Sequence, residues 1–126
     1  MKFCLIVDDS DVIRKVACKI VEGMGHIAVE AETAEAGLRL CQASMPDMIL
    51  LDWQLPGMSS MDFLAELGRV NSDRSPQILY AVTEADPHDL ARAYRCGIAG
   101  HILKPYDRQT LGPALAALDK ATSVLV

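Results

Sequence analysis

The chain has 126 residues, a length typical of one domain with a full hydrophobic core. Its apolar fraction of 51% and charged fraction of 23% exclude low-complexity and disordered classes. Acidic residues outnumber basic ones by 17 to 12, and the formal charge of −5 argues against a general nucleic-acid binder, because such proteins neutralise phosphates with basic side chains. Of the acids, 11 are Asp and 6 are Glu, an excess that points to loops, helix caps or a site.

The cysteines and the N-terminus indicate a cellular compartment. No two of Cys4, Cys18, Cys41 and Cys96 have the short spacing of a zinc knuckle or a CxxC redox motif. Three of them lie in apolar periodic segments, which predicts reduced, structural thiols in a cytoplasmic protein. The N-terminal apolar run reaches Asp8 too early for a signal peptide, and no apolar stretch approaches the roughly 20 residues of a membrane helix.

Short apolar runs alternate with longer amphipathic segments along the chain. The short runs predict five strands, at residues 3–7, 27–31, 48–51, 78–82 and 99–103. Helical spacing predicts helices over residues 11–24, 33–44, 59–70, 86–96 and 107–121. Ser10 and Thr33 are candidate N-caps of the first two helices, and either Ser59 or Ser60 starts the third.

This alternation predicts an α/β fold with a five-stranded parallel sheet between two helical layers. Right-handed crossovers leave few topologies, of which the flavodoxin-like (βα)5 three-layer sandwich with strand order 2-1-3-4-5 leads. Pro113 cannot donate a backbone hydrogen bond to residue 109, so the last helix either starts late, near Thr110, or has a distorted first turn. We expect residues 1–126 to form one domain, without a linker or repeat.

Polar residues end four of the five predicted strands. Ligands of an open parallel sheet bind outside the carboxyl ends of its strands, where Asp8, Asp9, Asp52, Thr83 and Lys104 would meet. Three close carboxylates repel one another, and a hard cation such as Mg²⁺ relieves the repulsion. A carboxylate can also attack phosphorus, with a lysine, a hydroxyl and a metal ion stabilising the transferred group. The set predicts phosphoryl transfer to an aspartate.

The motifs that carry these residues are IVDDS at 6–10, LLDWQLPGM at 50–58, AVT at 81–83 and KP at 104–105. In order and spacing the chain resembles, over essentially its full length, the receiver domain of two-component response regulators, of the single-domain, chemotaxis-regulator type. The resemblance implies that Asp52 accepts a phosphoryl group from the phosphohistidine of a sensor histidine kinase or a histidine phosphotransferase.

A metal site is also implied by the resemblance. Asp9 would be a direct Mg²⁺ ligand, and Asp8 would assist through water. Asp52 and the backbone carbonyl of Gln54 would complete the protein's share of the coordination, and Mn²⁺ would substitute for Mg²⁺.

The resemblance further assigns a switch. Thr83 would move toward the phosphate, Lys104 would pair with it, and the bond before Pro105 would be cis. The switch aromatic of the family falls on His101, where Tyr or Phe is commoner. Either this imidazole packs inward weakly or in a pH-dependent way, or it is only a partly exposed strand residue.

Two predicted surfaces are candidates for partner binding. Arg14, Lys15 and Lys19 form a basic patch on the first helix, which is either a solvated face or a docking site for an acidic kinase surface. The face made by the fourth helix, fifth strand and fifth helix would bind an unknown downstream protein, and its candidate residues are Arg92, Tyr94, Arg95 and Tyr106. Trp53 is a packing residue or a fluorescent reporter of the site.

The leading hypothesis is a phosphorylation-activated switch that catalyses only its own phosphorylation and dephosphorylation and is otherwise not an enzyme. It would be a monomer or a weak, phosphorylation-dependent dimer without direct nucleic-acid or membrane contact. An aspartyl-phosphate phosphatase would need an acid at position 54, where Gln54 stands, and a cap domain. A phosphate-independent interaction module would not need all five site residues. A receiver fragment of a longer regulator also remains open.

Overall fold

The computed structural model describes residues 1–124, in which five strands alternate with five helices. The strands are β1 (Phe3–Val7), β2 (Ile27–Ala31), β3 (Met48–Asp52), β4 (Gln77–Val82) and β5 (Gly100–Leu103). The helices are α1 (Asp11–Gly23), α2 (Ala34–Ala43), α3 (Ser60–Leu67), α4 (Pro87–Arg95) and α5 (Arg108–Val124). Each strand thus lies within one residue of its predicted bounds, whereas α3 ends three residues earlier than predicted.

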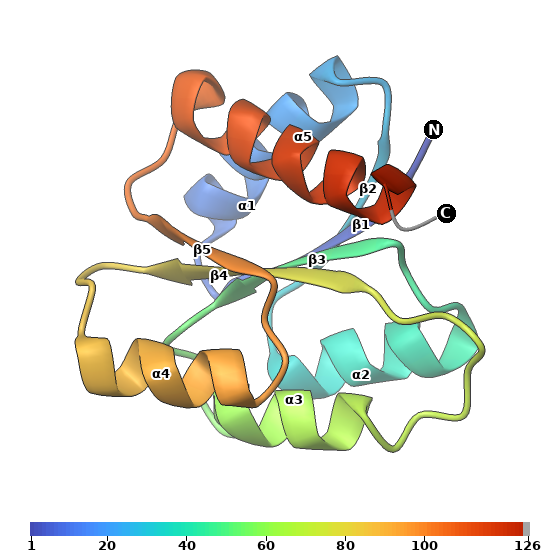
Figure 1. Ribbon diagram of the computed structural model, residues 1–126, viewed down its shortest axis with the longest axis vertical. Coiled ribbons are helices and arrows are strands. Elements are labelled where there is room, and N and C mark those ends of the chain that lie inside the picture. Colours follow the sequence, from blue (N-terminus) through green and yellow to red (C-terminus); the bar gives the residue numbers. More distant parts are fainter. Residues whose placement is uncertain (125–126) are drawn as a thin grey trace.

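The sheet is parallel throughout and has the order β2-β1-β3-β4-β5, which confirms the predicted flavodoxin-like topology. Helices α1 and α5 cover one face of the sheet, and α2, α3 and α4 cover the other (Figure 1). Alternate side chains of β1 therefore enter two different cores: Leu5 and Val7 pack with residues of α2 and α3, and Cys4 and Ile6 with residues of α1 and α5. Burial on both faces explains why the central strands are nearly continuous apolar runs.

Capping residues mark where the first three helices begin after the loops that follow the strands. The hydroxyls of Ser10 and Thr33 accept the predicted capping hydrogen bonds at the starts of α1 and α2. Ser59 is the N-cap of α3, and its Oγ accepts a hydrogen bond from the Asp62 N–H at 3.1 Å. Ser60 is therefore free for another contact, which is described below.

The start of α5 excludes one of the two alternatives at Pro113. The helix begins at Arg108 and contains Pro113, so a late start near Thr110 is wrong. Asp107 Oδ1 accepts a hydrogen bond from the Thr110 N–H at 3.0 Å, and Thr110 Oγ1 accepts one from the Asp107 N–H at 3.0 Å. This reciprocal cap stabilises the first turn ahead of the proline. The carbonyl that the N–H of residue 113 would otherwise bond belongs to Gln109, which is exposed, so water can solvate it.

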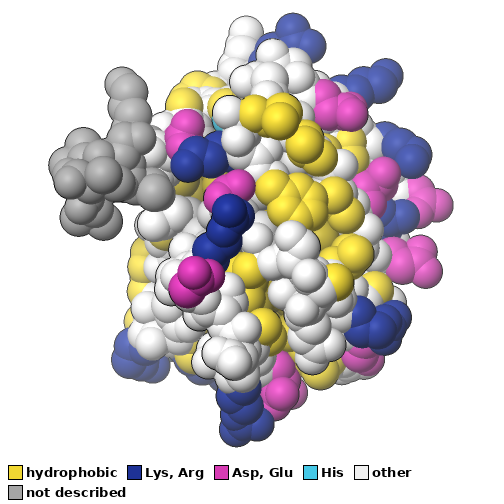
Figure 2. Space-filling model, turned by 90° about the vertical axis from the view of Figure 1, so that its right-hand side faces the viewer, with side chains coloured by type: hydrophobic (Ala, Val, Ile, Leu, Met, Phe, Trp, Pro, Cys, Tyr) yellow, Lys and Arg dark blue, Asp and Glu magenta, His cyan; other side chains and the backbone are white. Residues whose placement is uncertain are grey.

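At the amino ends of the strands, Asp47 links β1 to the loop that precedes β4. Asp47 Oδ2 accepts a hydrogen bond from the Phe3 N–H at 2.8 Å, and its Oδ1 pairs with Arg74 at 3.4 Å. Figure 2 views the side on which the N-terminus and the loops after α2 and α3 lie, and shows acidic and basic side chains interspersed around apolar surface.

All four cysteines are free thiols, as predicted. Burial raises the pKa of Cys4 to about 12 and that of Cys41 to about 11, so these thiols are unreactive near neutral pH. Among the described helices, none combines the length and the apolar character needed to cross a membrane.

Candidate functional site

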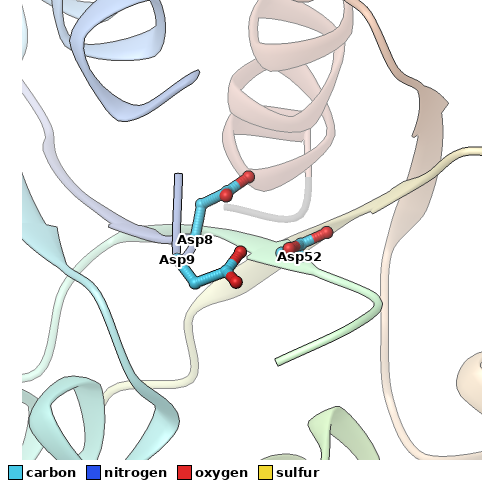
Figure 3. Close-up of side chains that lie close together, drawn as sticks. All are labelled: Asp8, Asp9 and Asp52. Atoms are coloured by element: carbon cyan, nitrogen blue, oxygen red, sulfur yellow. The ribbon is translucent and has the colours of Figure 1, made fainter. Parts of the chain in front are cut away.

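Three carboxylates meet at the carboxyl ends of β1 and β3. Asp8 and Asp9 follow β1 directly, and Asp52 is the last residue of β3 (Figure 3). The parallel register pairs Val7 with Leu51, which brings the residues that follow these two into proximity. One oxygen from each carboxylate lies within 4.8 Å of the other two. Asp8 is 2% exposed and Asp52 4%, whereas Asp9 is open to solvent, so the cluster has a buried base and an accessible rim.

Lys104 is the cation of this cluster. Its Nζ donates hydrogen bonds to Asp8 Oδ2 at 3.0 Å and to Asp52 Oδ1 at 3.1 Å. Burial lowers the pKa of Lys104, but the hydrogen bonds and charges of Asp8 and Asp52 raise it by more, so the side chain stays an ammonium. The peptide bond between Lys104 and Pro105 is cis, as predicted.

One ammonium does not balance three carboxylates. Burial and the charge of Asp8 raise the pKa of Asp52, although Lys104 and the backbone N–H of Gln54 act in the opposite direction. Carboxylate oxygens at this separation are the ligands that Mg²⁺ prefers, and an added cation would offset the excess negative charge. The donor set therefore fits a hard divalent cation.

An open cavity of about 410 Å³ lies over the accessible rim of the cluster. It is lined by Asp9, Asp52, Trp53, Gln54, Leu55, Pro56, Thr83 and Lys104. Thr83, which is exposed, is thus brought to the same cavity as Asp52, in agreement with the prediction from strand ends. The loop beyond Pro56 turns at Gly57, whose φ of +74° favours glycine, and a Cβ there would approach Glu35 Oε2 at 3.0 Å.

A second cavity, of about 610 Å³, lies beside the first between Trp53 and α4. Its lining comprises Trp53, Thr83, Glu84, Asp86, His88, Asp89, Arg92 and Arg95. Trp53 and Thr83 line both cavities, so these two side chains separate the carboxylate cluster from the charged start of α4.

His101 lies outside both cavities. It is exposed on β5, its Nδ1 lies 2.8 Å from the hydroxyl oxygen of Tyr94, and the two rings meet edge to face with centroids 5.8 Å apart. Tyr94 of α4 therefore holds the imidazole on the outer surface. Tyr106, predicted for the same outer face, is 7% exposed and packs in the core beneath α1 and α5, so that prediction is wrong.

Two contacts that support the carboxylates were not predicted. Ser60 Oγ donates a hydrogen bond to the backbone carbonyl of Asp52 at 2.5 Å, and Arg14 Nη1 donates one to the carbonyl of Asp8 at 2.6 Å. The assignment of Arg14 to an exposed basic patch is wrong, because only 7% of this residue is exposed. Lys15 and Lys19 are exposed, as predicted. The only sequence signal for Ser60 was its position beside the N-cap.

The chain belongs to the response regulator receiver domain family, whose family model matches residues 4–116. It is 30% identical over 119 residues to the phosphate regulon transcriptional regulatory protein PhoB of Escherichia coli, covering 94% of this chain and 52% of PhoB. It thus spans about half the length of that relative. Identity to the chemotaxis protein CheY of Pseudomonas aeruginosa is 26% over 108 residues, with 85% of this chain and 87% of CheY covered. The sensor histidine kinase AruS of the same organism is 31% identical over 123 residues, which are 96% of this chain and 12% of the kinase.

Solved structures show the same architecture. The chemotaxis protein CheY4 of Vibrio cholerae superposes with a TM-score of 0.88 at 25% identity, covering 94% of this chain and 98% of CheY4. A CheY-like receiver domain protein from Methanospirillum hungatei has a TM-score of 0.86 at 23% identity, with 98% of each chain covered. These findings confirm the resemblance that the strand-end motifs indicated.

Proposed function

We propose that this receiver domain is a phosphorylation-activated signalling switch whose phosphoacceptor is Asp52. The observation that carries the proposal is the cluster of Asp8, Asp9 and Asp52, with oxygens within 4.8 Å of one another and with Lys104 hydrogen-bonded to two of the carboxylates. The donor would be the phosphohistidine of a sensor histidine kinase or of a histidine phosphotransferase. The occurrence of a similar sequence within the kinase AruS supports this class of partner.

The metal would be held by Asp9, Asp52 and the backbone carbonyl of Gln54, with Asp8 assisting through water. Mg²⁺, or Mn²⁺ in its place, supplies positive charge that offsets the charge of the carboxylates and of the incoming phosphoryl oxygens. Asp9 suits this role because it lines the open cavity, whereas Asp8 is buried beneath it.

The transfer step follows from the position of Asp52. One carboxylate oxygen attacks phosphorus, the bond between phosphorus and the donor imidazole nitrogen breaks, and its electron pair stays on that nitrogen. Lys104, already 3.1 Å from Asp52, keeps its proton and donates hydrogen bonds to the phosphoryl group. The protein catalyses only its own phosphorylation and the later hydrolysis of the acyl phosphate, so we do not propose an enzyme with a separate substrate.

The switch would run from Thr83 to His101. Thr83 would donate a hydrogen bond from its hydroxyl to a phosphoryl oxygen, which would draw the loop before α4 toward the site. His101 would then leave Tyr94 and pack inward, in the way the family's switch aromatic does. The position of Thr83 on both cavities supports its role as the moving part.

Output would occur on the face formed by α4, β5 and α5, through an unknown downstream protein. Tyr94 is 44% exposed and Leu103 53% exposed on this face, which gives it apolar surface to bury.

The chain would be a monomer or a weak phosphorylation-dependent dimer, without direct nucleic-acid or membrane binding. Free thiols support a cytoplasmic location. The exposed Val12 and Lys19 of α1 would contact the kinase or phosphotransferase.

The test is phosphorylation by a small acyl phosphate, followed by intact-mass spectrometry. The wild-type chain with Mg²⁺ should gain one labile phosphoryl group, and the adduct should be absent in chelator and in Asp52→Asn. Asp73→Asn, an exposed loop substitution, is the matched control and should be labelled like the wild type. Labelling that persists in Asp52→Asn would overturn the assignment of the phosphoacceptor.

A further inference from the structure

Arg14 is a buried side chain with several polar partners near the carboxylate cluster, although it is not a member of the cluster. Its side chain is 9% exposed and lies between the start of α1, the end of β1 and β2. Nη1 donates to the carbonyl of Asp8 at 2.6 Å, and Nε donates to Glu30 Oε1 at 3.1 Å. Nη2 pairs with Asp11, and Glu32 Oε2 lies 3.9 Å from the same nitrogen.

The contact with Asp8 acts on the peptide group that carries Asp9. The other polar groups of Asp8 are also engaged: its N–H donates to the Ala31 carbonyl at 3.1 Å, and Oδ1 accepts from the Ser10 N–H at 2.9 Å. Oδ2 accepts from Lys104. The carbonyl that Arg14 holds belongs to the peptide bond between Asp8 and Asp9, so its orientation fixes the direction in which Asp9 leaves the strand.

The ion pairs of Arg14 lie outside the cluster. Asp11 and Glu30 pair with the guanidinium, and Glu32 Oε2 lies 3.9 Å from it, so these carboxylates offset its charge. The effect of Arg14 on the carboxylates is therefore geometric, through one short charge-assisted hydrogen bond to a backbone carbonyl. The planar fork of a guanidinium can serve this carbonyl and the carboxylates of α1 and β2 at once, which a single ammonium cannot do.

We infer that Arg14 is a positioning residue of the metal site, which holds the peptide group between Asp8 and Asp9 so that Asp9 faces Asp52. The inference rests on the proposed function, in which Mg²⁺ binds between these carboxylates. Partners of this outer kind orient the ligands of metal sites, and their loss weakens metal affinity without removing a ligand.

The experiment is calorimetric titration of the full chain with Mg²⁺, at a temperature where each variant is folded. Arg14→Gln and Arg14→Lys should both weaken Mg²⁺ binding by about tenfold, the range for loss of a partner that orients a metal ligand. The lysine variant is informative because it keeps the charge and most of the packing, and it remains a test if the glutamine variant fails to fold.

Lys15→Gln is the matched control. Lys15 is exposed, lies next to Arg14 on α1 and also pairs with Glu30, at 3.4 Å. Its loss should change Mg²⁺ affinity by less than about twofold, as for an exposed ion pair. A second readout is phosphorylation by acyl phosphate: in the Arg14 variants the half-saturating Mg²⁺ concentration should rise tenfold or so, with a rate at saturating Mg²⁺ within about twofold of wild type.

The outcomes separate the inference from the proposed function. If the wild type binds Mg²⁺ and both Arg14 variants bind it as tightly as Lys15→Gln does, Arg14 only stabilises the fold and the inference is overturned. If Arg14→Lys binds like wild type and Arg14→Gln does not, charge and not geometry matters, and the inference also fails. If the wild type itself does not bind Mg²⁺, the proposed function fails.

Discussion

The ammonium of Lys104 lies 3.1 Å from Oδ1 of Asp52, although 52 residues separate them in the sequence. The contact joins the ends of two strands that are not neighbours in the sheet, because β4 lies between β3 and β5. Lys104 reaches over the end of β4, and its backbone N–H donates to the Val82 carbonyl at 2.7 Å. The strand order thus places the cation of the site.

Removal of this cation should destabilise the fold. Lys104→Met leaves Asp8 and Asp52 buried without their cation, and should lower the free energy of unfolding in chelator by about 3 kcal/mol. Adding Asp52→Asn to Lys104→Met should recover part of this loss, because one of the two unpaired charges is gone. Urea unfolding of both single variants and of the double variant measures the coupling. Strictly additive effects would contradict an interaction between Lys104 and Asp52.

Asp52 should make stability fall as the pH rises. Burial and the charge of Asp8 raise its pKa in the folded state above the ordinary value of 3.8, so the folded protein binds a proton more readily than the unfolded chain does. The resulting stability is fully present below pH 3.8 and is lost as the pH rises through the higher folded-state pKa.

Asp52→Asn should remove this loss and be more stable than wild type near pH 7 in chelator, by about 1 kcal/mol, because the amide carries no charge to bury and is not repelled by Asp8. Urea unfolding between pH 4 and neutrality measures the difference, and Asp73→Asn on the exposed loop controls for loss of charge alone. A difference between Asp52→Asn and wild type that does not grow with pH would refute the raised pKa.

Mg²⁺ should stabilise the folded protein through the same carboxylates. A ligand that binds only the folded state adds about 2.7 kcal/mol when its concentration is roughly a hundred times Kd. Asp9→Asn removes the accessible carboxylate and should abolish most of this gain, while leaving stability in chelator equal to or above that of wild type because one repulsive charge is gone. Thermal melting with and without Mg²⁺ is the measurement. An unchanged Mg²⁺ response in Asp9→Asn would exclude it as a ligand.

His101 should report the switch. Its hydrogen bond to Tyr94 is exposed, so the imidazole can be released at small cost, of the order of 1 kcal/mol or less. With Mg²⁺ and beryllofluoride as a phosphoryl mimic, NMR shifts should change over residues 84–101 in wild type. In His101→Ala these changes should shrink, with phosphorylation of Asp52 intact. Tyr94→Phe, which removes only the hydroxyl, should retain them. An unchanged response in His101→Ala would leave His101 a plain surface residue.

The sequence alone predicted the topology, and it predicted which polar residues meet at the carboxyl ends of the strands. Buried apolar runs ending in Asp8, Asp52, Thr83 and Lys104 predict parallel strands, and parallel strands place their carboxyl ends at one edge. The positions of these residues therefore follow from local periodicity and a general property of such sheets. The family motifs, with their fixed spacing, then indicate the chemistry.

Only the tertiary structure decided which side chains are buried outside those motifs. On α1 the apolar Val12 is 72% exposed, whereas Arg14 is buried. Arg14 can be buried because carboxylates of β2 and of the helix start compensate its charge, and because the Asp8 carbonyl at the end of β1 accepts its hydrogen bond. No local sequence pattern identifies the hydrogen-bond and ion-pair partners that the sheet brings together. The outward position of His101 likewise depends on Tyr94 of the packed α4, and the buried position of Tyr106 on the core that α1 and α5 complete. The hydrophobic periodicity of the sequence therefore predicted the edge of the sheet at which the site lies. Long-range contacts decided which polar side chains support that site.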